Sequence, residues 1–412
     1  MIISLYLFLF LLIQLTSCEP SSTKIVASQL KSILNSYYMF AKYGKKGNLI
    51  LLSTSVESEV SRQLVTLYDP KKETEGAYVP IKTNVIVPIN DRISLNGDEY
   101  KESITLRTKT STQIDNFSLI ITEKNKNYFG FNSAFAFAHK IEDENYSLTH
   151  LLKRQNEIDR LKFSFQISND KENGTLYFGG LPESIINEYN YKTVIPLSDK
   201  NSKFWEIKID YLFIGDISYV YSNTYIQNNY KVRISTNTPK IKAPKPIVEF
   251  IVNNLFNQSL SNGVCKLVEY SYEVNCDCND IENFSDVSFV INSKEVKFKA
   301  KELFYEERDN CIFTFIYDDK YPNEWLVGKT FLQKFIAEFD YENDEFTLYS
   351  QSQNFADVDL NTLFPSHRIL KWFLIILGII VFVVFARMGY RYYKKRKMIK
   401  MNRYIKQVYQ EL

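Results

Sequence analysis

Two serine-containing turns are the first candidates for chemistry in this chain of 412 residues. An apolar strand leads into Leu51-Leu52-Ser53-Thr54-Ser55 in the first half, and another leads into Ile234-Ser235-Thr236-Asn237-Thr238 in the second. A serine hydroxyl becomes a useful nucleophile only beside a general base such as histidine. The candidate bases, His139 and His150, lie in a segment that we expect on the outer side of the first half. A serine nucleophile is therefore not predicted.

The two turns are part of a weak internal duplication. An aromatic pair and a glycine, Tyr128-Phe129-Gly130, follow the first turn, and Leu326-Val327-Gly328 follows the second. This repeated pattern predicts two lobes of like construction.

Short segments with an apolar residue at every second position run through the body and predict strands. Examples are Asn84 to Val87, Ser103 to Leu106, Phe163 to Ile167 and Val287 to Ile291. Few segments are typical of helices, and we expect them over Ser28 to Asn35, Leu148 to Gln155, Lys245 to Asn254 and Phe331 to Phe335. The fold class is therefore predicted to be mostly β.

Cysteine spacing indicates disulfides rather than a metal site. The chain has five cysteines, and Cys18 lies at the end of an expected signal peptide. The remaining cysteines are even in number, as an oxidising compartment favours, and they are Cys265, Cys276, Cys278 and Cys311. A zinc site at the Cys276-x-Cys278 pair would need further cysteine or histidine ligands, and the histidines are distant in sequence. We expect two disulfides and neither a metal nor another cofactor.

Apolar segments at both ends predict a membrane-anchored protein of the secretory pathway. Residues 1–18 form an apolar run ending in small residues, as a cleaved signal peptide does, with a retained anchor as the alternative. Residues 369–386 contain a single charge, Lys371, and favour a transmembrane helix. Basic residues gather after Arg387, which places that end in the cytoplasm. A stalk is expected over residues 351–368.

The basic charge of the chain is concentrated in its predicted cytoplasmic tail, residues 387–412. The whole chain has 50 basic and 48 acidic residues, and without this tail the acidic residues outnumber the basic ones. A mildly acidic body gives no reason to expect nucleic acid as a partner. The tail ends in Tyr409-Gln410-Glu411-Leu412, which matches the Tyr-x-x-apolar sorting pattern read by endocytic adaptors. The expected partners are thus the membrane and an endocytic adaptor.

Sequons of the form Asn-x-Ser/Thr mark expected surface positions in such a protein, and we expect about half of them to carry a glycan. They lie at Asn116, Asn145, Asn173, Asn257 and Asn283.

Several fragments, taken in their order, resemble the pepsin-like aspartic protease family. They are Tyr128-Phe129-Gly130-Phe131, Leu161-Lys162-Phe163-Ser164-Phe165, Gly174-Thr175-Leu176-Tyr177-Phe178-Gly179-Gly180, Ile195-Pro196-Leu197, Phe204-Trp205-Glu206-Ile207, and the segment from Trp325 to Asp340. The resemblance implies a bilobal pepsin-like β-barrel fold. Its lobes would cover residues 19–200 and 201–350.

The catalytic residues of that family do not match this chain. Its members cut peptides with two aspartates, each in an Asp-Thr-Gly or Asp-Ser-Gly turn, and this sequence contains neither turn. On the resemblance, the matching positions are Ser53 and Ser235. Two close carboxylates share a proton so that one can activate water, whereas serine is neither charged nor basic near neutral pH. Loss of one acid–base group typically costs about 10²–10⁴ in rate, so the resemblance implies an inactive homologue.

The resemblance further implies a disulfide from Cys276 or Cys278 to Cys311, and a long cleft between the lobes. Such a cleft could bind an extended peptide by strand-like pairing. We therefore expect a membrane-anchored, catalytically inactive homologue that acts as a receptor, adaptor or scaffold.

Two alternatives remain open on the sequence. One is a glycoprotein whose cleft binds nothing. The other is an active membrane-anchored aspartic endopeptidase with non-standard carboxylates, such as Glu57 with Asp210 or Glu249.

Overall fold

The alternating segments predicted as strands are strands in the computed structural model of the chain. They lie in β5 (Lys82–Asn90), β6 (Ile93–Leu106), β9 (Lys162–Ile167) and β19 (Val287–Ile291). The chain divides into two units, Met1–Asp357 and Val358–Leu412. The structure describes residues 24–33, 36–43, 46–53, 64–65, 82–90, 93–106, 112–122, 133–140, 144, 147–167, 173–215, 224–228, 230–235, 240–307, 310–319, 322–323, 325–358 and 366–411.

The described residues in the first half of the body form mainly strands, with the short helices α3 and α4. Besides β5, β6 and β9 it contains β1 (Val26–Ile33), β2 (Ser36–Tyr43), β3 (Lys46–Ser53), β4 (Leu64–Val65), β7 (Thr112–Thr122), β8 (Ser133–Ala136), α3 (Leu148–Arg154), β10 (Asn173–Phe178), α4 (Glu183–Glu188) and β11 (Tyr191–Pro196).

The second half is also mostly strand, with a longer helical segment. It contains β12 (Glu206–Lys208), β13 (Tyr211–Ile214), β14 (Thr224–Gln227), β15 (Lys231–Ile234), β16 (Ile241–Lys242), α5 (Lys245–Ile251), the π-helix η2 (Val252–Phe256), α6 (Asn257–Ser261), β17 (Cys265–Val268), β18 (Glu273–Cys276), η3 (Ile281–Asn283), β20 (Lys294–Phe298), η4 (Ala300–Leu303), β21 (Phe304–Glu307), β22 (Asn310–Phe313), β23 (Phe315–Ile316), β24 (Leu326–Val327), α7 (Lys329–Leu332), β25 (Ile336–Asp340), β26 (Glu345–Ser350) and β27 (Phe355–Asp357).

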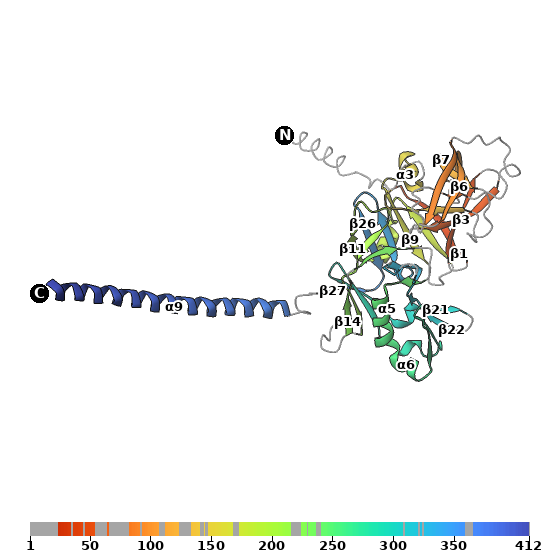
Figure 1. Cartoon of the computed structure of the whole chain (residues 1–412). Coiled ribbons are helices and arrows are strands. Elements are labelled where there is room, and N and C mark those ends of the chain that lie inside the picture. The colour runs from red at the N-terminus through yellow and green to blue at the C-terminus, as the bar shows by residue number, and fades with distance from the viewer. Residues whose placement is uncertain are drawn as a thin grey trace, which may run out of the picture. The chain divides into compact units, whose positions relative to one another are not determined.

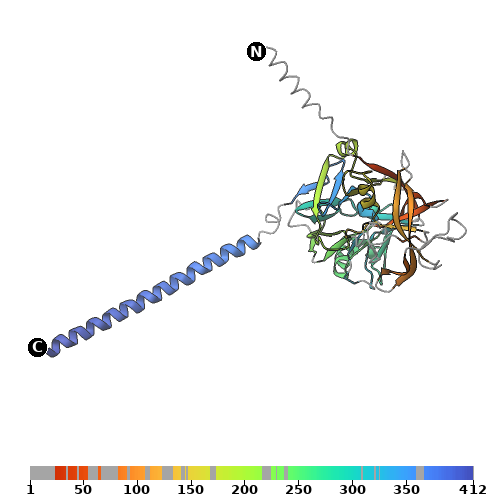
Figure 2. The same cartoon turned by 90° about the horizontal axis from the view of Figure 1, so that it is seen from above.

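An antiparallel run of strands joins the two halves, in the order β11-β26-β25-β9-β10-β1. In Figure 1 this run lies between β3, β6 and β7 on one side and α5, α6 and β22 on the other. In Figure 2 the blue C-terminal strands of the body lie beside the yellow-green strands of its middle. Strands from distant parts of the chain therefore close one sheet.

Within this run of strands, β25 and β26 are buried on both faces. Phe163, Phe165 and Phe339 belong to the main hydrophobic core, together with Trp205. Because side chains alternate along a strand, the neighbouring positions point to the other face. There Tyr177, Leu181, Ile336 and Tyr349 form a second, smaller apolar cluster. Successive side chains of these strands thus pack into two different apolar clusters, one on each face of the sheet.

Each half contains the same arrangement of four strands. In the first half β3 runs parallel to β8, β8 antiparallel to β4, and β4 parallel to β7. In the second half β15 runs parallel to β24, β24 antiparallel to β16, and β16 parallel to β23. The two halves of the body thus share one strand arrangement, while the bounds of the two predicted lobes stay a prediction.

Three of the four expected helices are present, and one prediction is wrong. Leu148 to Gln155 corresponds to α3, Lys245 to Asn254 to α5 with η2, and Phe331 to Phe335 overlaps α7, which begins earlier, at Lys329. The segment Ser28 to Asn35, however, lies largely in β1 rather than in a helix. It pairs with β10 on one side and β2 on the other, and this sheet pairing overrides the local helical pattern.

The second unit contains one long helix, α9 (Ser366–Glu411). Within the described residues, Trp372 to Arg403 is long and apolar enough to cross a membrane, with a mean hydropathy of 2.5 in its most apolar window. This stretch overlaps the span predicted over residues 369–386. The expected signal peptide, residues 1–18, lies outside the described residues. Part of the segment expected as a stalk forms β27, which pairs with β20.

Candidate functional site

Ser235 lies directly after β15, in the interior of the second half. Ser235 is 1% exposed, and its backbone N–H donates to the carbonyl oxygen of Val327 at 2.9 Å. The preceding Ile234 N–H donates to the carbonyl oxygen of Trp205 at 3.0 Å. The strand is thus held on both sides, by β24 and by the segment that leads into β12.

A charged pair fixes the same strand at its solvent side. The Arg233 side chain donates from Nε to Oε1 of Glu206 at 3.1 Å, and the two residues face each other across the β12–β15 pair. The Arg233 guanidinium also lies 4.0 Å from the ring centroid of Phe204. These contacts position β15, and with it the backbone of Ser235.

Ser53 occupies the equivalent place in the first half. It is the last residue of β3 and lies opposite Ala136 of the parallel strand β8. Ser53 therefore ends β3, and Ser235 directly follows β15, the equivalent strand of the repeated arrangement, as the match to the two catalytic positions implies. The side chain of Ser53 lies outside the described residues.

The strand beside Ser53 is not the one that the sequence suggested. Tyr128-Phe129-Gly130, expected to match Leu326-Val327-Gly328, lies outside the described residues. The place of β24 is taken in the first half by β8, which pairs in parallel with β3 through Ala134, Phe135 and Ala136. Strand β8 has Ala136 opposite Ser53, where the pattern of the second half predicts a glycine. The aromatic-Gly triplet a few residues earlier fits that pattern better, and the sequence therefore indicates the wrong partner for β3.

The described residues at these strand ends carry no acid or base that works near neutral pH. Ser53 and Ala136 are the last residues of the first pair of strands, and Ser235 and Gly328 directly follow the second pair. A lone hydroxyl cannot act as the shared-proton carboxylate pair of an aspartic dyad.

The alternative carboxylates are engaged in separate contacts. Asp210 follows β12, and its Oδ1 forms an ion pair with Nζ of Lys208 at 2.9 Å. Glu249 lies on α5, where it accepts a hydrogen bond from the Tyr272 hydroxyl at 2.7 Å. Glu57 lies outside the described residues. Among the described residues, Asp210 and Glu249 thus have different partners and form no carboxylate pair with each other.

Both described histidines of the body also have partners of their own. His139 contacts the Ser202 carbonyl and the Asp344 carboxylate, and His150 contacts the Ser147 hydroxyl at 2.7 Å. Burial lowers the pKa of His150, although the carboxylate of Glu144 opposes that shift. The contact of His139 with Asp344 gave no signal in the sequence.

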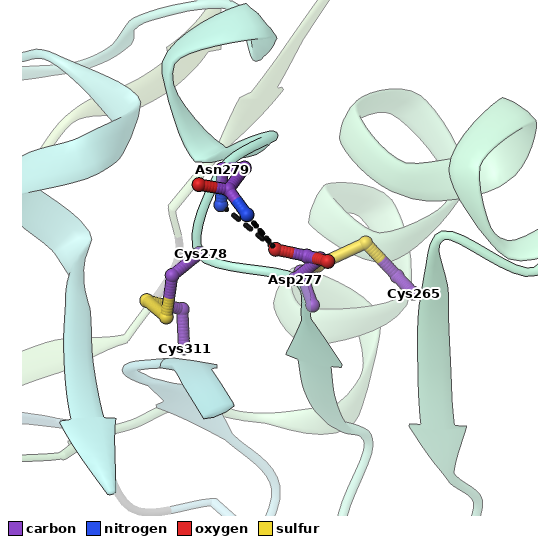
Figure 3. The surroundings of a disulfide bond; sticks show 6 residues. Cys265, Asp277, Cys278, Asn279 and Cys311 are labelled. Carbon is purple, nitrogen blue, oxygen red and sulfur yellow. Dashed lines mark hydrogen bonds between the residues drawn. A yellow bond between two sulfur atoms is a disulfide. The ribbon is translucent and has the colours of Figure 1, made fainter. Parts of the chain in front are cut away.

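The cysteines form two disulfides, as predicted. Cys265 joins Cys276 across the β17–β18 pair, and Cys278 joins Cys311 of β22. The second bridge resolves the choice between Cys276 and Cys278 as partner of Cys311. Figure 3 shows the loop between the bridges, where Asn279 donates from its backbone and its amide to Oδ1 of Asp277, each at 2.9 Å. With all four sulfurs bonded, these residues do not ligate zinc, and the described residues contain no cluster of metal-ligating side chains.

Three sequons lie at exposed positions: Asn173 in β10, Asn257 in α6 and Asn283 in η3. Asn145 and the side chain of Asn116 lie outside the described residues. Tyr409 is part of α9, while its side chain and Leu412 are likewise outside the description. Glycosylation and sorting stay predictions.

Comparison with known sequences finds relatives of this chain. A sequence model described as eukaryotic aspartyl protease matches residues 47–350, more than half of the 412 residues. The chain is 24% identical to the aspartic protease Bla g 2 of Blattella germanica over 174 residues, which is 41% of this chain and 44% of that protein. It is 24% identical to pepsin A of Gallus gallus over 189 residues, or 44% of this chain and 45% of the pepsin. The matched region thus spans less than half the length of these curated relatives.

Proposed function

Because this chain belongs to the eukaryotic aspartyl protease family, we propose that it is a membrane-anchored member without proteolytic activity, which binds extended peptide or protein segments between its two lobes. The observation that carries the proposal is the placement of Ser53 and Ser235 at the ends of β3 and β15. These strands are equivalent in the two halves, and both positions hold a hydroxyl where the family mechanism needs a carboxylate.

Loss of the carboxylates removes the chemistry without removing the architecture that would hold a ligand. The repeated four-strand arrangement is complete in each half, and the central sheet that joins the halves is intact. An extended segment can gain affinity from backbone pairing and specificity from alternate side chains. A receptor, adaptor or scaffold is therefore the function that this combination supports best.

The proposed membrane anchor is the apolar helix α9. One apolar helix and two disulfides are consistent with a single-pass protein of the secretory pathway. The basic residues after Arg387 favour a cytoplasmic location for that end. The terminal Tyr409-Gln410-Glu411-Leu412 would then be open to an endocytic adaptor, and the compartments served would be the cell surface and endosomes.

A turnover and binding assay on the full chain in detergent tests the proposal. The protein is incubated with a mixed peptide library from pH 3 to 7, with and without a transition-state inhibitor of aspartic proteases. We expect no inhibitor-sensitive cleavage and recovery of intact bound peptides. The variant Ser235→Ala serves as a matched control, because it should leave the absence of turnover unchanged.

Two results would contradict parts of the proposal. Inhibitor-sensitive cleavage would support the alternative of an active endopeptidase, and Asp210→Asn and Glu249→Gln would then identify the carboxylates. Absence of both cleavage and bound peptide would leave an idle cleft and remove the binding function.

A further inference from the structure

Three Asn-Gly pairs occur in the chain, and the structure places them in different surroundings. They are Asn96-Gly97, Asn173-Gly174 and Asn262-Gly263. In such a pair the backbone nitrogen of the glycine can attack the side-chain carbonyl carbon, Cγ, of the asparagine. Glycine favours this attack because it has no Cβ and its backbone adopts more conformations than that of other residues. Whether a pair reacts in the folded protein therefore depends on how firmly the backbone around it is held.

Two of the pairs lie inside sheets, with a paired strand on each side. Gly97 of β6 lies between β5 and β7, and Gly174 of β10 lies between β1 and β9. A Cβ added to Gly174 would lie 2.6 Å from the carbonyl oxygen of Gln166, so the backbone there is closely packed. At both pairs, rotation of the backbone towards the asparagine side chain would break the pairing of the strands.

The third pair lies in an exposed turn. Asn262 and Gly263 follow α6, and both residues are exposed. The N–H of Asn262 donates to the carbonyl oxygen of Gln258 at 3.0 Å, and that of Gly263 donates to the carbonyl oxygen of Leu260 at 3.3 Å. The second contact is longer than the usual length of about 2.9–3.0 Å. Gly263 has a φ of 75°, and no atom lies within 4 Å of the place where its Cβ would be. The attacking nitrogen is thus held by a long hydrogen bond and has room to move.

We propose that Asn262 is a site of spontaneous covalent modification, in which its side-chain amide becomes a carboxylate. The backbone nitrogen of Gly263 loses its proton and attacks Cγ of Asn262. The bond from Cγ to the side-chain nitrogen breaks, and that nitrogen takes up the proton and leaves as ammonia. The product is a five-membered succinimide ring between the two residues.

Water then opens the ring at one of its two carbonyl carbons. Opening at Cγ gives aspartate with the original backbone. Opening at the backbone carbonyl carbon gives isoaspartate, in which the backbone passes through the former side chain. The sequence of steps needs water and neither an oxidant nor a reductant. It does not depend on the proposed binding function.

The position of Asn262 gives this change a structural effect. The helical segments α5, η2 and α6 run without a break from Lys245 to Ser261, and Asn262 is the C-cap residue. The C-terminal end of a helix carries a partial negative charge, so a new carboxylate there is unfavourable. Beyond the turn, Cys265 is fixed by its disulfide to Cys276. Isoaspartate would therefore lengthen the backbone of a short connection that is held at both ends.

The test uses the full chain in detergent, produced without N-glycosylation so that the amide of Asn173 is free. The protein is incubated at neutral and at mildly acidic pH, and samples taken over time are digested and analysed by mass spectrometry for conversion of each asparagine. We expect Asn262 to be converted at least about tenfold faster than Asn96 or Asn173, because ring closure inside a sheet requires local opening, and about 1.4 kcal/mol of opening free energy slows a reaction tenfold. Conversion should be faster at neutral pH, because the attack needs a deprotonated backbone nitrogen.

Two controls separate the effect of the fold from that of the Asn-Gly sequence. In urea, where the sheets are unfolded, Asn96, Asn173 and Asn262 should be converted at similar rates. The variant Asn262→Gln should remove the reaction from the turn, because the longer side chain would have to close a six-membered ring. Equal rates at the three asparagines of the folded protein, or faster conversion of either strand asparagine, would overturn the proposal.

The variant Asn262→Asp carries the charge of the product and tests the structural effect. Its melting temperature should lie about 1–2 °C below that of Asn262→Gln, as a carboxylate at a helix C-terminus would give. Equal melting temperatures of the two variants would show that the new charge does not weaken the helix end.

Discussion

Phe163 of β9 and Phe339 of β25 stack with their ring centroids 4.6 Å apart and their planes 7° from parallel. The two residues are paired across the sheet and come from opposite halves of the body. Trp205 lies edge-on to both rings, with centroids 5.8 Å from Phe163 and 5.0 Å from Phe339. The junction between the halves therefore has an aromatic core.

Truncation of this core should destabilise the whole body. Phe339 is fully buried, so Phe339→Ala removes apolar contacts and leaves a cavity, at a cost of about 3–5 kcal/mol in the free energy of unfolding. Urea denaturation measures the loss. Phe339→Leu, which fills more of the space, should lose clearly less; equal losses would contradict a packing role.

Acid should weaken a second contact on the opposite face of the sheet. Burial raises the pKa of Asp340, but the hydrogen bonds from Lys162 and Asn343 outweigh it, so the folded pKa is below the usual value. A depressed pKa gives stability that is present above the unfolded pKa, near 4, and is lost as the pH falls through the folded value. Asp340→Asn should therefore lower the melting temperature at pH 6, and the difference should shrink towards pH 3.

An exposed ion pair provides the control for this prediction. Asp199 also pairs with a lysine, Lys231, at 3.0 Å, but it is solvent-exposed, and such pairs contribute little. Asp199→Asn should change the melting temperature only slightly at either pH. A response as large as that of Asp340→Asn would show that burial is not the cause.

The two disulfides should differ in their effect on stability. The Cys278–Cys311 bridge spans 33 positions and the Cys265–Cys276 bridge spans 11. In the loop-entropy account the longer loop contributes about 4 kcal/mol and the shorter about 3 kcal/mol. Urea unfolding of the paired variants Cys278→Ala with Cys311→Ala, and Cys265→Ala with Cys276→Ala, measures both. A larger loss from the shorter bridge would contradict an entropic origin.

Charges placed in the apolar part of α9 should abolish membrane anchoring. Lysine at the centre of a spanning helix costs about 2.5–3.5 kcal/mol on insertion scales, so Leu377→Lys with Ile380→Lys should release the protein into the alkaline extract of membranes. The control pair Tyr392→Lys with Tyr393→Lys lies among basic residues near the end of the apolar stretch and should stay in the pellet. Extraction of both pairs, or of neither, would count against this helix as the anchor.

Local patterns in the sequence locate several strands, but not every element or every strand partner. Alternation located β9 and β19, and the apolar-apolar-Gly triplet located β24 next to Ser235. The same triplet misplaced the partner of β3, because β8 has Ala136 where a glycine was expected. The prediction of a helix over Ser28 to Asn35 is wrong because β1 is held in strand form by pairing with β10 and β2. A pattern of neighbouring residues contains no information about these partners.

Apart from the disulfides, the contacts between side chains far apart in sequence give no signal in the sequence. His139 and Asp344 are separated by 205 positions, and Lys162 and Glu338 by 176. In a strand with alternating apolar and charged residues, the charged side chains are predicted to face solvent. Glu338 and Asp340 are nevertheless buried. Only the closure of the central sheet makes partners of these side chains.

The closure of the central sheet also determines the order in which its strands can pair during translation. While the chain is being made, β9 can pair with β10 at once, but its other edge stays open until β25 has emerged, because the partners Phe163 and Phe339 are far apart in sequence. An open strand edge lined with aromatic side chains is a template for misassembly, and contacts of this range form slowly. The nascent first half should therefore need chaperone protection until translation has passed Ser350, only a short distance before α9 begins.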